Sequence, residues 1–388
     1  MDLYVYYSII VFGIIISSLY IYIIFVRSFE RSNYKKKQKY EHILIPLVDN
    51  LITDLMNGMS INPSEKHILI KHMSQNKLKS SVVEERIIYY LENFKGDFTS
   101  CLIKFCVESG LIDRKIKELS KDNSYAKALS CKKLGELKST QAVPYLLKEV
   151  SSSSPDVTYN ALLALAKIGD IEGFLKAFEN VNASILLSER SLIEVVDSFE
   201  GNKFDLYSQM IDYDNEFVSC IFIKSASGYK DVVLGEQIAK FLKCDSKERT
   251  LSAIKALAGM HDTRYMNQIS ELLTNAAWEI RAIAAKALGS YDDLSVIDKL
   301  IGALSDKEWF VRYNAARSLL TLDKRLKYLS KVFEGEDKFA KDILLSAMEN
   351  DNILSFILDD TNPSHTFEEE TVRLIRNYIQ QGGDPKNE

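Results

Sequence analysis

Few side chains in this 388-residue chain have the types and spacing that catalysis or metal binding requires. The five histidines are His42, His67, His72, His261 and His365. His67 and His72 are five residues apart, so on a helix they would point about 140° away from each other. The sequence contains no HExxH motif, no cysteine cluster and no glycine-rich phosphate loop. We therefore predict no catalytic residue, no metal ligand and no cofactor.

The five cysteines form no CxxC pair, and most lie among apolar residues in helical patterns: Cys101, Cys106, Cys131, Cys220 and Cys244. Disulfide scaffolds are short and dense in cysteine, whereas this chain is long and cysteine-poor. We predict buried, reduced thiols. A redox pair of Cys101 and Cys106 is an alternative, although five residues along one helix is poor geometry for a disulfide.

An apolar segment at the N-terminus is the first element that must position the rest of the chain. Residues 3–26 contain no Asp, Glu, Lys or Arg. As a helix of about 36 Å they could cross a hydrocarbon layer of about 30 Å. Asp2 and the length of the apolar core argue against a cleaved signal peptide. We predict a single transmembrane helix over residues 3–26, with residues 1–2 as an extracytoplasmic tip.

A basic segment, residues 27–39, follows the apolar one and contains a single acid, Glu30. Its cations are Arg27, Arg31, Lys35, Lys36, Lys37 and Lys39. Positive charges beside a membrane helix stay on the cytoplasmic side and attract anionic lipid headgroups. The sequence thus predicts a single-pass cell-membrane protein with its N-terminus outside, basic side chains at the membrane interface and the remaining chain in the cytoplasm.

A repeat of 31 residues organises much of the remaining chain. Ala253, Ala284 and Ala315 open similar segments at this spacing, and Trp278 and Trp309 keep the same spacing. One copy carries two apolar stripes, the first with Ile280, Ala284, Ala287 and Leu288, and the second with Leu294, Ile297, Leu300 and Leu304. Each stripe has helical spacing, and neither helix could hide its stripe alone. We predict an all-α fold, an α-solenoid of stacked helix pairs.

The repeat resembles bacterial HEAT-like repeats of the PBS-lyase type. The best copies are Trp278 to Gly289, Asp306 to Leu320 and the Ala-Val-Pro-Tyr-Leu-Leu motif of residues 142–147. The resemblance covers about residues 122–350 and implies a membrane-anchored HEAT-repeat protein that binds other proteins. It leaves as an alternative a HEAT-like enzyme of the lyase or oxygenase type. Some such enzymes hold a di-iron centre with His-Glu pairs, and the only adjacent pair here is Glu41-His42.

Six parts are expected along the chain. They are the tip (1–2), the transmembrane helix (3–26), the basic juxtamembrane segment (27–39), a helical connector or cap (40–121), the HEAT-like solenoid (122–350), and a C-terminal helical cap with a frayed tail (351–388). Within the connector, breaks at Asn-Pro, Lys-Gly-Asp and Ser-Gly predict helices over residues 66–73, 82–94 and 98–108.

Charge argues against a nucleic-acid partner. The whole chain carries −5, and removing Asp2 and the net +5 of residues 27–39 leaves −9 for residues 41–388. Binding to phosphate backbones needs a basic surface. A local exception is a column of cations at equivalent repeat positions: Lys132, Lys224, Lys255, Lys286 and Arg317. The column is either a solvated edge or a strip that faces an acidic partner or the inner leaflet.

Trp278 and Trp309 are the only tryptophans, and each is followed three residues later by an arginine, Arg281 or Arg312. They either pack at helix starts, with the arginines paired to acids of the next repeat, or form exposed anchors of the kind found at binding hot spots. We expect protein partners, contact of the N-terminal helix with membrane lipid, and no small-molecule substrate. The predicted function is a membrane-tethered scaffold, or an accessory subunit of a membrane or envelope assembly, that binds through the solenoid surface.

Overall fold

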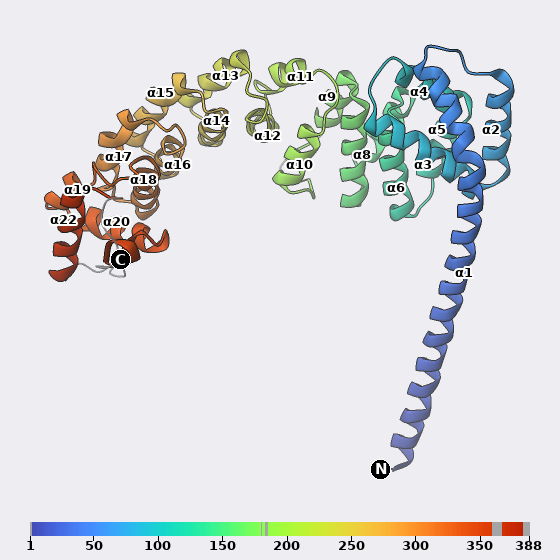
Figure 1. Cartoon of the computed structure of the whole chain (residues 1–388), viewed down its shortest axis with the longest axis horizontal. Helices are drawn as coiled ribbons and strands as arrows, with labels where there is room; N and C mark the ends of the chain where they lie inside the picture. The colour runs from blue at the N-terminus through green and yellow to red at the C-terminus, as the bar shows by residue number, and fades with distance from the viewer. Residues whose placement is uncertain (1, 180, 183–184, 359–366, 383–388) are drawn as a thin grey trace. The chain divides into compact units, whose positions relative to one another are not determined.

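The computed structural model describes residues 2–179, 181–182, 185–358 and 367–382 (Figure 1). Throughout these ranges the regular elements are helices and no strand occurs, so the predicted all-α solenoid fold is confirmed. Met1 of the predicted tip, and residues 359–366 and 383–388 of the predicted C-terminal part, lie outside the described residues. The chain divides into two compact units, residues 1–174 (unit 1) and residues 175–388 (unit 2).

Unit 1 begins with one long helix, α1 (Asp2–Met56). It continues through the boundaries predicted after residues 26 and 39, and the proline at position 46 does not end it. The helix stops at Met56, just before Gly58, which has a positive φ. Its large apolar side chains from Tyr6 to Phe25 are exposed. From Leu44 onward the helix has a buried face. One helix therefore carries both an unpacked apolar part and a part of the core of unit 1.

Three helices pack around the second part of α1: α2 (Pro63–Gln75), α3 (Lys77–Asn93) and α4 (Phe98–Glu108). Helix α5 (Leu111–Leu119) packs against α4. These four helices include the three predicted in the connector. The chain reverses between α2 and α3 at Asn76, whose side-chain oxygen accepts a hydrogen bond from the backbone N–H of Leu78. Arg86 of α3 donates to both carboxylate oxygens of Asp49 of α1, at 2.6 and 2.9 Å. This bidentate pair fixes α3 against α1.

The rest of unit 1 contains α6 (Ser124–Glu136), α7 (Val143–Glu149) and α8 (Pro155–Ile168). Pro144 occupies the first turn of α7, where its missing N–H removes no helical hydrogen bond. Helices α6 and α8 touch closely at Gly135, where an added Cβ would lie 2.5 Å from the Cα of Ala164. Helix α9 (Ile171–Glu179) follows.

Unit 2 stacks its helices in two rows (Figure 1). One row contains α10 (Glu189–Asp197), α12 (Glu216–Ala226), α14 (Lys247–Met260), α16 (Trp278–Leu288), α18 (Trp309–Leu322) and α20 (Lys338–Asn350). The other row contains α11 (Lys203–Met210), α13 (Val232–Ala239), α15 (Met266–Glu271), α17 (Ile297–Ala303) and α19 (Ser330–Glu334). Helices α21 (Ile353–Leu358) and α22 (Glu369–Gln380) complete the described part.

The core of unit 2 follows the repeat. Ala253, Ala284 and Ala315 are fully buried, at equivalent points of α14, α16 and α18. The first predicted stripe is buried in full, but Leu294 of the second is 50% exposed. Its place in the stripe was wrong because it opens a short 3₁₀ turn, residues 294–296, in which Val296 takes the buried position.

The thiols divide into buried and accessible ones. Cys106, Cys131 and Cys220 are buried, as predicted, whereas Cys101 is exposed and Cys244 is half-buried. The prediction of a buried thiol was therefore wrong for Cys101. Cys101 and Cys106 lie on different faces of α4, one toward solvent and one in the core. A disulfide between them would require α4 to unfold.

Candidate partner-binding surface

Arg281 of α16 lies beneath the predicted surface, not on it. Its Nε donates to Oδ2 of Asp306 at 2.6 Å and its Nη2 to Oδ1 at 2.8 Å. Its Nη1 donates to the backbone carbonyls of Asn275 and Ala276, at 2.9 and 3.1 Å. Burial would raise the pKa of Asp306, but hydrogen bonds from Arg281 and from the backbone N–H of Glu308 hold it below the usual range. Arg281 thus uses its donors to join α16 to the loop before α18.

Arg312 of α18 occupies the repeat position equivalent to Arg281 and is more exposed than Arg281. Its Nη1 donates to the backbone carbonyls of Asp306 and Lys307, at 3.0 and 3.3 Å. Its guanidinium carbon lies 5.9 Å from the ring centre of Phe339, on α20. The contact is a cation–π interaction. Arg312 therefore connects the start of α18 to an exposed aromatic ring of the next helix in the row.

Aromatic rings gather at the starts of α16, α18 and α20. Trp278 stacks on Phe310 with ring centres 5.6 Å apart and 23° between the planes. Phe310 meets Trp309 edge to face at 5.1 Å, and Trp309 stacks on Tyr313 at 4.9 Å. The side chains that we call the aromatic surface are Trp278, Trp309, Phe310, Tyr313 and Phe339. The structure thus brings the two predicted tryptophans together through a third ring.

Exposure within the aromatic surface is uneven. Trp278 is 37% exposed, Phe310 55% and Phe339 71%, whereas Trp309 is half-buried. The prediction from the repeat named the two tryptophans as candidate binding residues but did not include Phe310 or Phe339. Phe310 occupies the repeat position that Glu279 fills one copy earlier, so the 31-residue spacing gave no signal for it. The sequence signal for Phe310 is its position directly after Trp309, which makes two adjacent aromatic residues at the start of a predicted helix.

The column of cations runs along α12, α14, α16 and α18, one cation per helix. Lys224 pairs with Glu189 of α10, and Arg317 pairs with Asp351 at 3.4 Å. Lys255 and Lys286 have no ion pair in the described part of the chain. Within unit 2 the column therefore has two paired cations and two without an ion pair among the described residues. The fifth member, Lys132, belongs to unit 1, where it lies on α6 and pairs with Glu136 at 3.8 Å.

Lys255 and Lys286 line one cavity of about 310 Å³ between α14 and α16. Small and apolar side chains contribute most of its wall: Ala258, Gly259, Ile283 and Ala287, with His261 and Ser290 at one end. The ring Nδ1 of His261 lies 3.0 Å from the carbonyl oxygen of Ser290. We call this cavity the lysine groove. A largely apolar groove lined by two lysines suits an acidic and apolar ligand segment.

The predicted membrane-interface cations lie on α1. Arg27, Arg31, Lys35, Lys36 and Lys39 are exposed, and Lys37 is half-buried and pairs with Glu85 of α3 at 2.7 Å. Within the described residues, α1 is the one helix long and apolar enough to cross a membrane. Its most apolar 18-residue stretch has a mean hydropathy of 2.7 and is not buried. In the same described ranges, no three His, Cys, Asp or Glu side chains are grouped so that they could hold a metal ion.

Comparison with known protein families identifies repeats in two ranges of the chain. The model of the HEAT repeats family matches residues 112–181 and 236–352. No curated protein sequence matches the chain. Solved structures with a similar fold include an engineered protein at 17% identity, with 82% of this chain and 99% of that one covered and a TM-score of 0.34.

Two natural proteins are also similar. Kap121p is 12% identical, with 87% of this chain and 45% of that one covered and a TM-score of 0.45. The complex of CpcE and CpcF of phycocyanin lyase from Nostoc is 14% identical, with coverages of 69% and 94% and a TM-score of 0.26. At these identities and TM-scores the three likenesses carry no conclusion about this chain.

Proposed function

We propose that this HEAT-repeat chain, with its repeats in residues 112–181 and 236–352, is a membrane-tethered scaffold that binds protein partners through unit 2. The observation that carries the proposal is the exposed aromatic surface at the starts of α16, α18 and α20. Exposed tryptophan and phenylalanine rings beside an arginine have the composition of binding hot spots.

The aromatic surface is held in place before any partner arrives. Trp278 and Phe310 fix each other by stacking, and Trp309 is fixed by Tyr313. Beneath them the Arg281–Asp306 pair anchors the start of α16 to the loop before α18. Binding through rings that already have one orientation loses little side-chain entropy. This supports a role in recognition and not only in packing.

The lysine groove adds a chemical preference for the partner. Lys255 and Lys286 are cations in a chain whose residues 41–388 carry a net charge of −9. An acidic segment would neutralise them, while its apolar side chains would cover Ala258 and Ile283. We therefore assign to the partner a protein segment that combines acidic and apolar residues.

The long helix α1 supplies the tether. We assign residues 3–26 to the membrane, residues 27–39 to its cytoplasmic face and the two units to the cytoplasm, with the N-terminus outside. Exposed apolar side chains from Tyr6 to Phe25, followed by exposed cations, support this assignment. A tether raises the local concentration of unit 2 near partners in the same membrane.

A crosslinking experiment in native membranes tests the proposal. The full chain carries an affinity tag, and the amount of crosslinked partner is measured for the wild type, for W278A and for F310A. We expect each substitution to lower recovery by about tenfold while the chain stays folded at the temperature of crosslinking, which thermal unfolding checks. The control is V233A, which shortens an exposed apolar side chain of α13 in the other row. Equal recovery from all four proteins would contradict the proposal.

A further inference from the structure

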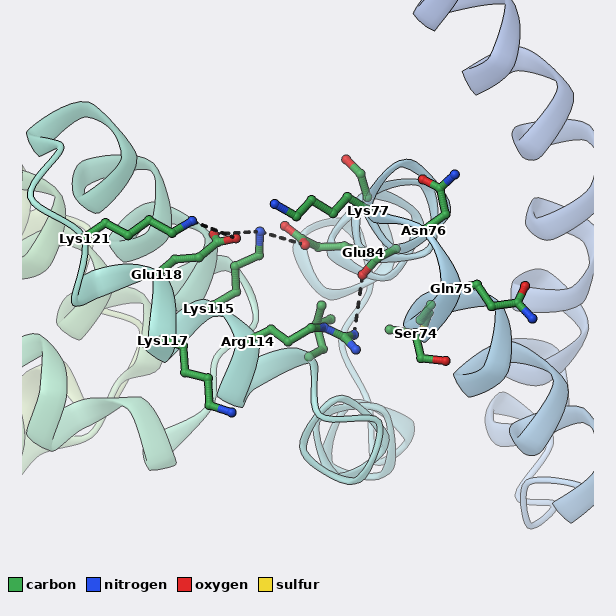
Figure 2. A pocket seen from close by; sticks show the side chains of 14 residues that line it. Ser74, Gln75, Asn76, Lys77, Glu84, Arg114, Lys115, Lys117, Glu118 and Lys121 are labelled. Carbon is green, nitrogen blue, oxygen red and sulfur yellow. Dashed lines mark hydrogen bonds and ion pairs between the residues drawn. The ribbon is translucent and has the colours of Figure 1, made fainter.

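Unit 1 contains a cavity of about 490 Å³ between the end of α2, the start of α3 and α5 (Figure 2). Five cationic side chains line it: Lys77, Arg114, Lys115, Lys117 and Lys121. Two acids, Glu84 and Glu118, also line it, so the net charge of the cavity wall is +3. This positive cavity has no role in the proposed function. Helices α2 and α3 precede the first range that the HEAT-repeat model matches, whereas α5 overlaps it.

Both acids form ion pairs with lysines of the cavity wall. Lys115 lies 3.1 Å from Glu84 and 3.7 Å from Glu118, and Lys121 lies 4.0 Å from Glu118. Figure 2 shows these four side chains as one connected chain along the cavity. Glu84 is buried, and burial raises its pKa despite the nearby charge of Lys115. The acids therefore balance Lys115 and Lys121 and leave the other three cations unbalanced.

Lys77, Arg114 and Lys117 have no ion pair within the described residues. Lys77 is the first residue of α3, and Arg114 lies on α5, so they line the cavity from different helices (Figure 2). Nη2 of Arg114 lies 3.5 Å from the hydroxyl of Ser80, which also lines the cavity. The positive end of the α3 dipole adds to the potential at Lys77. The guanidinium of Arg114 and the hydroxyl of Ser80 thus lie close together on the cavity wall, and Lys77 adds a second positive charge to the same wall.

Phosphate is the ligand group that this arrangement fits. A planar guanidinium can donate two parallel hydrogen bonds to phosphate oxygens, and an ammonium neutralises the second charge of a phosphate monoester. The volume is that of a small-molecule site, too small for a folded partner. Met73 and Leu111 provide apolar wall for the carbon part of a ligand. We propose that the cavity binds a phosphate monoester through Arg114, Lys77 and Ser80.

The ester has two possible sources, and the structure connects the cavity to one of them. Ser81 on the cavity wall donates to Glu85 at 2.9 Å, and Glu85 pairs with Lys37 of the basic segment at 2.7 Å. If α1 crosses a membrane as proposed above, a phospholipid headgroup lies on the same side as this segment. The other source is a soluble phosphorylated molecule. The chemistry of recognition is the same for both.

Calorimetric titration of the full chain, reconstituted in neutral phosphatidylcholine vesicles, with inorganic pyrophosphate tests the site. We expect saturable binding below about 1 mM that R114Q and K77Q each weaken by about tenfold. The control is K104Q, which removes the same charge from an exposed position of α4 outside the cavity. Absence of binding by the wild type, or equal binding by all variants, would overturn the proposal. Melting curves identify any variant that fails to fold. If R114Q or K77Q fails to fold, the affinity of the other cavity variant for pyrophosphate tests the proposal.

Adding phosphatidic acid to the same vesicles distinguishes the two sources, because its headgroup is a phosphate monoester. Weaker binding of pyrophosphate in its presence, with no such change for R114Q, would support a lipid headgroup as the ligand. Unchanged binding of pyrophosphate would support a soluble phosphorylated molecule. Both results support the phosphate site, and neither depends on the aromatic surface of unit 2.

Discussion

Trp278 and Phe310 stack across neighbouring helices of unit 2, with ring centres 5.6 Å apart and planes inclined by 23°. They do not occupy equivalent positions in the repeat, since Phe310 aligns with Glu279. Each ring limits the rotation of the other while both keep solvent-exposed area. The stack therefore combines two properties of an interface anchor, rigidity and exposed apolar surface.

The Arg281–Asp306 pair should matter to stability more than any exposed pair. R281A would leave the carboxylate of Asp306, whose side chain is 12% exposed, without its partner, so we expect a loss of about 3 kcal/mol in the free energy of unfolding. Denaturant unfolding of the full chain measures it. The control is K331A, which removes the exposed partner of Asp298 and should change stability far less. Equal losses from R281A and K331A would show that the buried pair does not anchor α16.

The same pair predicts a pH dependence. The folded pKa of Asp306 lies below its ordinary value of 3.8, so the unfolded state binds more protons around that pH. The stabilisation by the ionised carboxylate is present in full well above pH 3.8 and disappears as pH falls through the folded pKa. We expect the stability difference between the wild type and D306N to shrink as pH falls below 3.8. A difference that stays constant down to the acid transition would contradict this.

Gly289 should resist substitution because α16 and α18 meet there. An added Cβ would lie 2.5 Å from Oγ and 3.0 Å from Cα of Ser318. We expect G289A to lower the free energy of unfolding by about 1–3 kcal/mol. The matched control is Gly302 of α17, where an added Cβ meets no atom within 4 Å. G302A should be neutral or stabilising by up to about 1 kcal/mol, since alanine favours the helix. A melting temperature that falls more for G302A than for G289A would contradict the close contact of α16 with α18 at Gly289.

How much the sequence predicts is clearest from these residues. The repeat placed Trp278 and Trp309 at the starts of α16 and α18, and the alanines at equivalent buried positions, because residues 31 apart occupy the same place in successive helix pairs. Whether the tryptophans bind a partner stays a prediction. The repeat could not locate Phe310, since its contact with Trp278 depends on how two helices are rotated against each other. Nor could it indicate the cavity of unit 1, because two of the three helices that line it, α2 and α3, precede the repeats.

The cysteines should react in two classes. Burial raises the pKa of Cys106 and of Cys131 to about 12, helped by the charges of Glu84 and Glu149 respectively. At neutral pH only roughly one molecule in 10⁵ would carry either thiolate, and both side chains are shielded. We expect a small thiol reagent to modify exposed Cys101 in the native protein, and Cys106 and Cys131 only after unfolding. Peptide mapping by mass spectrometry after timed alkylation measures this, and early labelling of Cys106 would contradict the packing of α4.

Site-specific photocrosslinking tests the central claim, that the aromatic surface binds a membrane partner, most directly. A photoreactive phenylalanine analogue replaces Phe339, and in a control protein it replaces Val233, an exposed residue of the other row. After illumination of intact membranes, we predict a discrete crosslinked product from position 339, its loss when W278A is added, and none from position 233. Only uncrosslinked chain from position 339, or the same products from both positions, would contradict the claim.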